Sequence, residues 1–380
     1  MENVADKIVH QFISHAVDLS RFEEDVKNRV LFFLKKLYTS LAEDINLGLG
    51  TSYSQAKLRA LKSQVRQTIS TAYTKSEKTL NSELSKLAPL EGTFTKTAIN
   101  SAVGANLLTT SLAPDFLKVI TERTLVMGAP SADFWARQPK ILTERFMSEM
   151  QIGIARGEPI NVLVQRIRGL PTGKRIAYKT KSGKRRVLVD FQGGVLDLQT
   201  RGATAMVRTS LQTIANKVRH ETFQANDDII KGQQWLSTLD QRTTPICQAL
   251  DGLEWDLEGN PIGGHTEPFS PPPAHWNCRS TLVPILKSWD ELSKSKSPDL
   301  RKKLQKAEKN LSESERASMD HPVSSRMNYT EWFNKQSKAR QIDILGPGKF
   351  EIFKKGKLSF RDMIDQTGNP LTIKELQKKI

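Results

Sequence analysis

Residues 235–282 constrain the fold of this chain more than any other part of its 380 residues. Both cysteines, Cys247 and Cys278, lie in this stretch, and His275 precedes the second cysteine by three positions. A loop rich in glycine and proline, residues 259–273, separates the two cysteines, and its composition excludes a long helix or a central strand. Because such a loop lets the chain turn back, we expect a Cys-containing turn to lie beside a His-x-x-Cys turn.

Three residues of this stretch, Cys247, His275 and Cys278, carry the thiolate and imidazole donors that zinc prefers. The candidates for a fourth ligand are Asp240, Asp251 and His265. The spacing differs from that of paired Cys-x-x-Cys sites, so a second interpretation stays open, in which the cysteines are small buried apolar residues and the histidine is a hydrogen-bonded core residue. A third is a Cys/His hydrolase, which needs a base and an orienting carboxylate beside the thiolate. The sequence identifies no oxyanion hole or substrate pocket for it.

Length and cysteine content exclude several classes of protein. A chain of 380 residues has room for two or three domains with a substantial core. No apolar run approaches the length of a membrane-spanning helix, and residues 1–6 lack the basic and apolar regions of a signal peptide. Two cysteines do not make a disulfide framework, so we expect assembly in a reducing cytoplasm and no membrane partner.

The charge balance of the chain is strongly basic. A formal net charge of +16 and an isoelectric point near 9.7 favour contact with a polyanion, most often a nucleic acid. A solvated basic surface explains the same numbers. Charge alone does not separate the two explanations.

Residues 1–113 are predicted to be a helical N-terminal region. Apolar residues recur at three- and four-residue steps through 22–45 and again through 58–72, as on one face of a helix. The first helix is expected to end at Gly48 or Gly50, and the second to begin after the capping candidates Ser52 and Ser54; a third would run through 84–87 toward Gly92. The apolar faces either form a bundle or dock onto helices of another protein.

From residue 114 the pattern changes to shorter helices. One of them begins at Glu158-Pro159 and is closed by Gly169, with proline near the first turn and glycine after the end. A longer helix is predicted over residues 203–223. Three polar side chains of this helix are candidates to support the loop that follows, namely Arg208, Asn216 and Arg219.

A basic hairpin is predicted within residues 171–191, with a turn at Ser182-Gly183. No acidic residue lies among its basic ones, which are Lys174, Arg175, Lys179, Lys181, Lys184, Arg185 and Arg186. This hairpin is either a charged, exposed loop or an arm that binds the phosphate backbone of DNA. Beyond it, residues 287–322 form a charged linker, and residues 323–380 contain enough aromatic residues for a small C-terminal subdomain.

The paired motif resembles that of the phage Mu F-like head morphogenesis proteins, also called minor head or minor capsid proteins. Residues 238–252 fit Thr-x-Asp-x-Arg-Thr-x-x-x-Cys-x-x-Leu-Asp-Gly, and residues 272–281 fit Pro-Pro-x-His-x-x-Cys-Arg-Ser-Thr. The similarity extends upstream through 153–169 and downstream to 341–360. The residues expected to form the structural motif are Asp240, Arg242, Thr243, Asp251, Gly252, Arg279 and Ser280. Some members have another cysteine where this chain has Thr244, and the basic hairpin resembles an insertion.

Patterns and resemblance together predict an α+β fold, mainly α. It would comprise the helical region, a compact central domain over 114–286 with a small β component and the hairpin inserted at 171–191, and the C-terminal appendage. The resemblance implies a structural, non-enzymatic protein of the phage head interior, assembled in the host cytoplasm. Its implied partners are the portal, the major capsid or scaffold proteins, and double-stranded DNA. The alternatives are a thiol- or zinc-dependent hydrolase or effector carried in the head, and a plain DNA-binding protein.

Overall fold

The computed structural model describes most of the chain and confirms the predicted α+β, mainly α fold. The described residues are 4–49, 54–179, 183–288, 291–292, 315–316, 323–324, 327–356, 358–365 and 368–378. The charged linker predicted over 287–322 falls almost wholly outside them. In the described part, no helix combines the length and the apolar character needed to cross a membrane.

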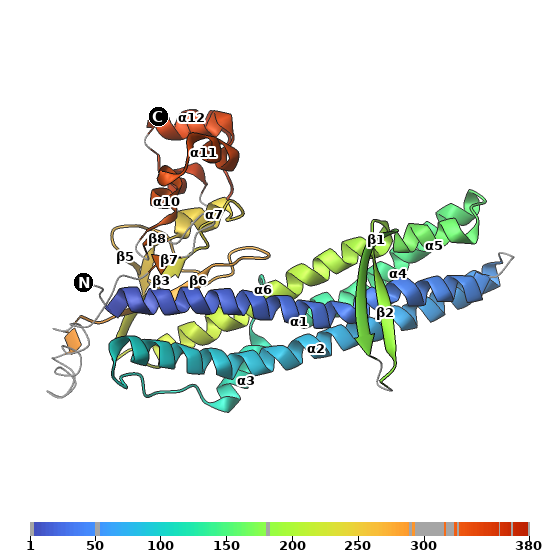
Figure 1. Ribbon diagram of the computed structural model, residues 1–380, viewed down its shortest axis with the longest axis horizontal. Helices are drawn as coiled ribbons and strands as arrows, with labels where there is room; N and C mark the ends of the chain where they lie inside the picture. The colour runs from blue at the N-terminus through green and yellow to red at the C-terminus, as the bar shows by residue number, and fades with distance from the viewer. Residues whose placement is uncertain are drawn as a thin grey trace. The chain divides into compact units, whose positions relative to one another are not determined.

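The elements follow one another as labelled in Figure 1. The helices are α1 (Val4–Leu49), α2 (Gln55–Val103), α3 (Pro114–Arg123), α4 (Ser131–Ala155), α5 (Ile160–Arg168), α6 (Gly194–Gln224), α7 (Pro245–Leu250), α10 (Tyr329–Lys335), α11 (Lys338–Leu345), α12 (Pro347–Gly356), α13 (Ile373–Gln377) and the 3-10 helix η1 (Phe360–Met363). The strands are β1 (Leu170–Lys179), β2 (Arg185–Gln192), β3 (Ile230–Leu236), β4 (Glu254–Asp256), β5 (Pro261–Ile262), β6 (Thr281–Leu286), β7 (Glu315–Arg316) and β8 (Val323–Ser324).

The second and third helices predicted in the N-terminal region are one continuous helix, α2. It passes through Pro89 and Gly92, so the expected end at Gly92 is wrong. The helix continues past the glycine because residues on both sides of it, such as Leu87 and Ile99, are buried; a Cβ at Gly92 would make only an ordinary contact, at 3.7 Å, with the Val218 side chain of α6. At the start of α2 the expected cap is present, since the Lys57 amide donates to Ser54 Oγ at 3.2 Å.

The described chain divides into two compact units that are both discontinuous in sequence. One comprises residues 1–20, 87–122 and 212–380, and the other comprises 21–86 and 123–211. The long helices α1, α2 and α6 each contribute residues to both units. The boundaries of these two units differ from the domain ranges 1–113 and 114–286 expected from the sequence. Those ranges stay a prediction about which segments carry which function.

The first unit contains the paired motif and a four-stranded antiparallel sheet with strand order β5-β4-β3-β6 (Figure 1). One core cluster combines Phe12 of α1, Phe223 of α6 and Leu282 of β6. A second cluster joins Leu239 of the motif to aromatic residues of the C-terminal helices, among them Tyr329, Trp332, Phe333, Phe353 and Phe360. Residues from both ends of the chain thus stabilise the segment that carries the motif.

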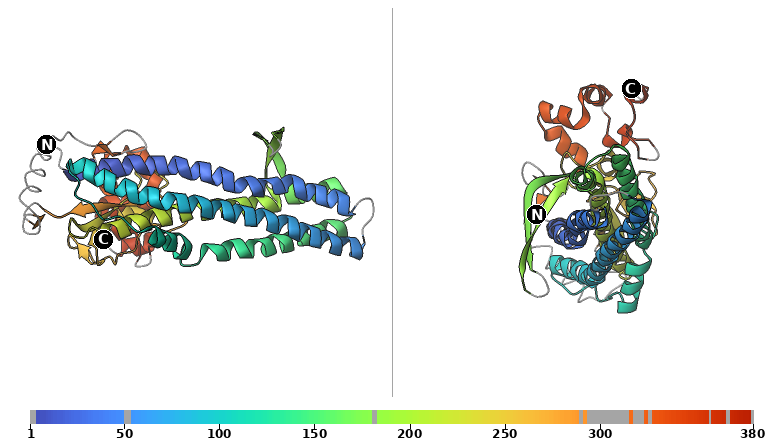
Figure 2. Two further views of the ribbon diagram at one scale, coloured as in Figure 1. Left: turned by 90° about the horizontal axis from the view of Figure 1, so that it is seen from below. Right: turned by 90° about the vertical axis from the view of Figure 1, so that its right-hand side faces the viewer.

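The second unit is formed by helices and the β1–β2 hairpin. Here α1 and α2 lie side by side (Figure 2), and the Ser76 hydroxyl of α2 donates to the Val30 carbonyl of α1 at 2.9 Å. The Tyr73 ring of α2 packs against Trp135 of α4, with centroids 6.1 Å apart. The apolar faces predicted over 22–45 and 58–72 are largely used inside the unit, because most of their residues are buried, among them Val26, Val65 and Ile69.

A buried ion pair joins α2 to α6 in the first unit. Glu91 and Arg219 have side chains that are 0% exposed, and Arg219 Nε donates to Glu91 Oε2 at 2.9 Å. The His15 ring of α1 lies 2.7 Å from the other carboxylate oxygen. Burial alone would raise the pKa of Glu91, but the charge of Arg219 and the hydrogen bond with His15 lower it below its ordinary value.

We expect Glu91→Ala to lower the free energy of unfolding by about 3 to 5 kcal/mol, because it leaves the Arg219 charge buried and unpaired. Chemical denaturation at neutral pH measures the change. Glu122→Ala, which removes an exposed carboxylate from α3, is the matched control and should change stability little. Equal, small effects of the two substitutions would show that the pair is not a structural requirement.

Candidate functional site

Strand pairing brings the two halves of the motif together. Strand β3 leads into residues 238–252, and residues 272–281 lead into β6; the two strands are antiparallel neighbours, with Trp235 opposite Leu282 and Leu236 opposite Thr281. The motif halves therefore meet at the same edge of the sheet. The predicted return of the second turn to the first is confirmed by this register.

Asp240 and Arg279 join the two halves directly. Arg279 Nη1 and Nη2 each donate to one oxygen of the Asp240 carboxylate, both at 2.7 Å. The same carboxylate accepts the Arg242 amide at 2.9 Å and lies 3.2 Å from the Thr243 hydroxyl. Burial would raise the pKa of Asp240, but its hydrogen bonds and ion pair with Arg279 lower it below the ordinary range.

Asp251 fixes the other end of the first motif half. One of its oxygens accepts the Ser237 amide at 2.6 Å, and the other accepts the Tyr329 amide at 2.8 Å. Gly252 follows with φ +84°, which favours glycine, and its amide donates to the Trp235 carbonyl at 2.9 Å. Gly252 thus bonds the end of the first motif half to β3, and Asp251 bonds it to the start of α10.

The second motif half is held by hydrogen bonds from Ser280 to the first half and from side chains of helix α6. The Ser280 hydroxyl lies 3.2 Å from that of Ser237, which itself donates to the Cys247 carbonyl at 2.8 Å. Asn216 Oδ1 accepts the Leu282 amide at 3.1 Å, and Arg219 donates to the Thr281 hydroxyl. Two of the three predicted supports on α6 therefore contact this segment. The third, Arg208, pairs instead with Glu24 at 3.2 Å.

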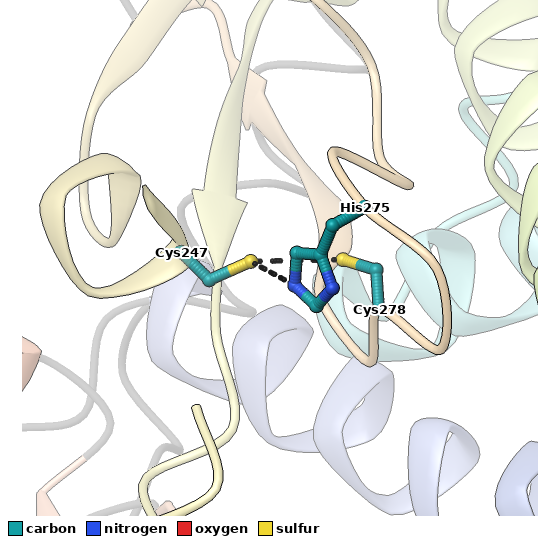
Figure 3. A group of neighbouring side chains, drawn as sticks. All are labelled: Cys247, His275 and Cys278. Atoms are coloured by element: carbon teal, nitrogen blue, oxygen red, sulfur yellow. Dashed lines mark hydrogen bonds between the residues drawn. The ribbon is translucent and has the colours of Figure 1, made fainter. Parts of the chain in front are cut away.

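The structure brings Cys247, His275 and Cys278 into one group (Figure 3). Cys247 Sγ lies 3.1 Å from His275 Nε2 and 3.7 Å from Cys278 Sγ, and the ligand atoms of all three lie within 4.8 Å of one another. Both thiols are buried, at 2% and 1% exposure. Asn277, with φ +61°, bends the intervening turn so that His275 and Cys278 face the same point. Metal binding by this group stays a prediction.

None of the predicted fourth ligands belongs to this group. Asp240 is bound to Arg279, and Asp251 accepts two backbone amides. His265 Nε2 lies 2.8 Å from the Glu254 carbonyl, and its Nδ1 accepts the Glu267 amide at 3.3 Å. Each candidate thus has its polar atoms engaged elsewhere in the fold.

The residue nearest to a fourth position is Thr244, which the ligand predictions did not include. Its hydroxyl lies 2.8 Å from His275 Nε2. Thr244 is the N-cap residue of α7, yet its side chain makes no capping hydrogen bond to that helix. A hollow of about 20 Å³ lies at this point, large enough for about one water molecule.

The two buried thiols and the imidazole shift one another's pKa values. The hydrogen bond from Cys247, followed by that of His275, lowers the pKa of Cys278 well below its ordinary value, although burial opposes this shift. The hydrogen bond with Cys278, together with burial, raises the pKa of Cys247. The pKa of His275 is raised, chiefly by its interaction with Cys278.

The basic residues predicted to bind DNA lie on the β1–β2 hairpin, apart from Lys181, which falls outside the described residues. Six of them are exposed, namely Lys174, Arg175, Lys179, Lys184, Arg185 and Arg186. The other face of the hairpin packs on α1, where Tyr178 contacts Phe32 at 5.1 Å between centroids and Lys35 pairs with Asp190 at 2.8 Å. The aromatic ring is therefore used in packing.

Fold and motif define the class of this protein: a mainly helical α+β protein whose small antiparallel sheet presents a paired Cys and His-x-x-Cys motif. Residues 145–283 match the family model described as "Phage Mu protein F like protein". The match confirms the resemblance over this region, which is similar to the Mu F-like head morphogenesis proteins. Searches of curated proteins and of solved structures found no match. The matched family implies a role in phage head morphogenesis.

We expect Asp240→Asn to lower the free energy of unfolding by about 2 to 3 kcal/mol at neutral pH, because it removes the charge that pairs with Arg279. Since the pKa of Asp240 is lowered in the folded protein, this contribution is complete above the ordinary carboxyl pKa of about 3.9 and is lost as the pH falls through the lowered value.

Denaturation curves of both proteins across this acid range measure the difference. Asp343→Asn, at an exposed position of α11, controls for the loss of a carboxylate. A stability difference that stays constant down to the lowest pH would contradict the assignment to the Asp240 charge.

Proposed function

We propose that this protein is a minor head protein that acts in procapsid assembly, associated with the portal and with packaged DNA in the head interior. The observation that carries the proposal is the Mu F-like match over residues 145–283, together with the closely bonded motif inside it. Its role is structural: it supplies a fixed scaffold that contacts the portal and capsid proteins. The helical N-terminal third is the proposed docking region.

The outward-facing apolar residues of α1 and α2 support the docking role. Leu47 is 86% exposed near the end of α1, and Leu90 is 61% exposed within α2. Large exposed apolar side chains contribute to protein interfaces when a partner covers them. In contrast, Ile8 and Phe12 of α1 are buried in the core of the first unit. Docking must therefore use the outer face of these helices, and removing the N-terminal residues would disrupt the fold.

We expect Leu47→Glu and Leu90→Glu, alone or together, to reduce incorporation into procapsids when the protein is expressed with its portal and capsid proteins. The expected loss is about tenfold or more, equivalent to at least about 1.4 kcal/mol of interface energy. Ile373→Glu, at a residue of α13 that is 44% exposed, is the matched control and should leave incorporation unchanged.

Normal incorporation of the double variant would show that docking uses another surface. If the wild-type protein never associates with portal or procapsid, the proposed function itself fails. Circular dichroism on each variant separates loss of docking from loss of fold.

The outer face of the hairpin supports the proposed contact with DNA. Lys179 and Arg185 are directly paired across the two strands, and Arg175 lies on the same face, opposite Val189. Like charges on paired strands repel one another, and a phosphate backbone between them would relieve this repulsion. Because Tyr178 packs on Phe32, we propose contact with the DNA backbone and no stacking on bases.

If the hairpin neutralises about five phosphates, the logarithm of the affinity for duplex DNA should fall with the logarithm of salt concentration at a slope of about −4 to −5. Replacing Lys184, Arg185 and Arg186 by serine should flatten the slope by about 2 to 3 units. The control variant replaces three exposed lysines of the C-terminal helices, Lys335, Lys338 and Lys374. An equal change in both variants would assign the effect to net charge alone.

The hydrolase alternative receives no support from the site geometry. The cysteines are almost completely buried, and the hollow beside them has a volume of about 20 Å³, enough for about one water molecule and too small for a substrate. Of the motif carboxylates, Asp240 is held by Arg279 and Asp251 accepts two backbone amides, whereas the Nδ1 atom of His275 faces the Trp276 carbonyl. The buried thiols of Cys247 and Cys278, packed between the two turns of the motif, suit a structural role.

A further inference from the structure

We propose that Cys247, His275 and Cys278 bind one zinc ion, with the fourth position at the side chain of Thr244. The site would fix the two motif halves to each other and would not catalyse a reaction. This inference goes beyond the proposed role in head assembly and does not depend on it.

The spacing of the sulfurs fits a shared metal ion. Cys247 Sγ and Cys278 Sγ are 3.7 Å apart, and a tetrahedral zinc with Zn–S bonds of about 2.3 Å holds two sulfurs about 3.8 Å apart. A disulfide would require about 2.05 Å. The distance of 3.1 Å from Cys247 Sγ to His275 Nε2 is a few tenths of an ångström shorter than the roughly 3.5 Å expected around zinc. A small outward movement of the ring would therefore admit the ion.

The imidazole of His275 is oriented as a ligand. Its Nδ1 lies 2.9 Å from the Trp276 carbonyl, and a carbonyl oxygen only accepts hydrogen bonds, so Nδ1 carries the proton. In the neutral ring, the lone pair of Nε2 then faces the Cys247 sulfur (Figure 3) and the Thr244 hydroxyl. A backbone carbonyl bound to the other ring nitrogen is the usual support of a zinc-bound histidine.

Charge balance favours the same ion. Binding releases the thiol protons to solvent, and two thiolates then balance the two positive charges of zinc, so that the buried site is neutral. The Arg279 guanidinium, which lines the hollow, is paired with Asp240. Soft thiolates together with an imidazole select zinc over calcium or magnesium.

Thr244 occupies the remaining corner. Its hydroxyl lies 2.8 Å from His275 Nε2 and makes no capping bond to α7. The hollow beside it has room for about one water molecule. Apart from the ligands, the residues lining it are threonines, a serine, an asparagine and arginines, with no carboxylate among those described. A zinc-bound water would thus lack the general base that hydrolytic sites use.

The test uses the full-length protein, purified under reducing conditions, equilibrated with Zn²⁺ and dialysed. We expect one zinc per chain by elemental analysis. With Co²⁺ in place of zinc, the spectrum should show thiolate-to-metal charge-transfer bands and the intense visible bands of tetrahedral cobalt. Cys247→Ser and Cys278→Ser should lose these bands, whereas His265→Ala should retain them, because that ring is bound to Glu254.

A gain-of-ligand variant keeps the proposal falsifiable even where the cysteine variants fold poorly. Thr244→Cys places a third thiolate at the fourth corner, so the charge-transfer intensity should rise and the affinity for zinc should increase by about tenfold or more. Thr244→Val should bind zinc without that gain.

Several results would overturn the proposal. They are zinc content far below one per chain after equilibration, a cobalt spectrum without thiolate bands, and an intact mass lower by the two hydrogens of a Cys247–Cys278 disulfide. A Thr244→Cys variant with unchanged zinc affinity would disprove the assignment of the fourth corner.

Discussion

The paired hydrogen bonds between Asp240 and Arg279 are the constraint on which the motif depends. They join a turn that follows β3 to a turn that precedes β6, across a glycine- and proline-rich loop that has little regular structure of its own. Once these turns are fixed, Cys247 and the His275 to Cys278 turn face each other, and Asp251 can reach the amide of Tyr329. The same contact therefore positions the buried sulfurs and the C-terminal helices.

Most of this arrangement could be predicted from the sequence, because its determinants are local. Periodic apolar residues indicate α1 and α6, and the paired motif indicates that its halves meet. Local signals fail where distant packing decides the structure: Gly92 does not end a helix, because residues beyond it, such as Ile99, are buried in a core with Phe223 and Leu282. The role of Thr244 was equally hidden, since threonine before proline is typical of a helix cap, whereas here its hydroxyl faces His275.

The two compact units have different physical characters that fit different tasks. The first contains buried polar networks, such as Glu91 with Arg219 and Asp251 with its two amides; networks of this kind favour one conformation because partial satisfaction is costly. The second presents a hairpin whose outer face carries like charges opposite each other, an arrangement that is tolerated because these side chains are exposed to solvent.

The packing of Phe12 with Leu282 in one core has a consequence for synthesis. The first helix leaves the ribosome when its partner strand has not yet been translated, and at about 5 to 20 residues per second roughly a quarter of a minute to a minute separates the two. During that interval the apolar face of the helix has no native partner from the sheet, and contacts of such long sequence separation form slowly. The unit that contains the motif is therefore completed only after translation has passed β6, which makes it a late step in the maturation of the chain.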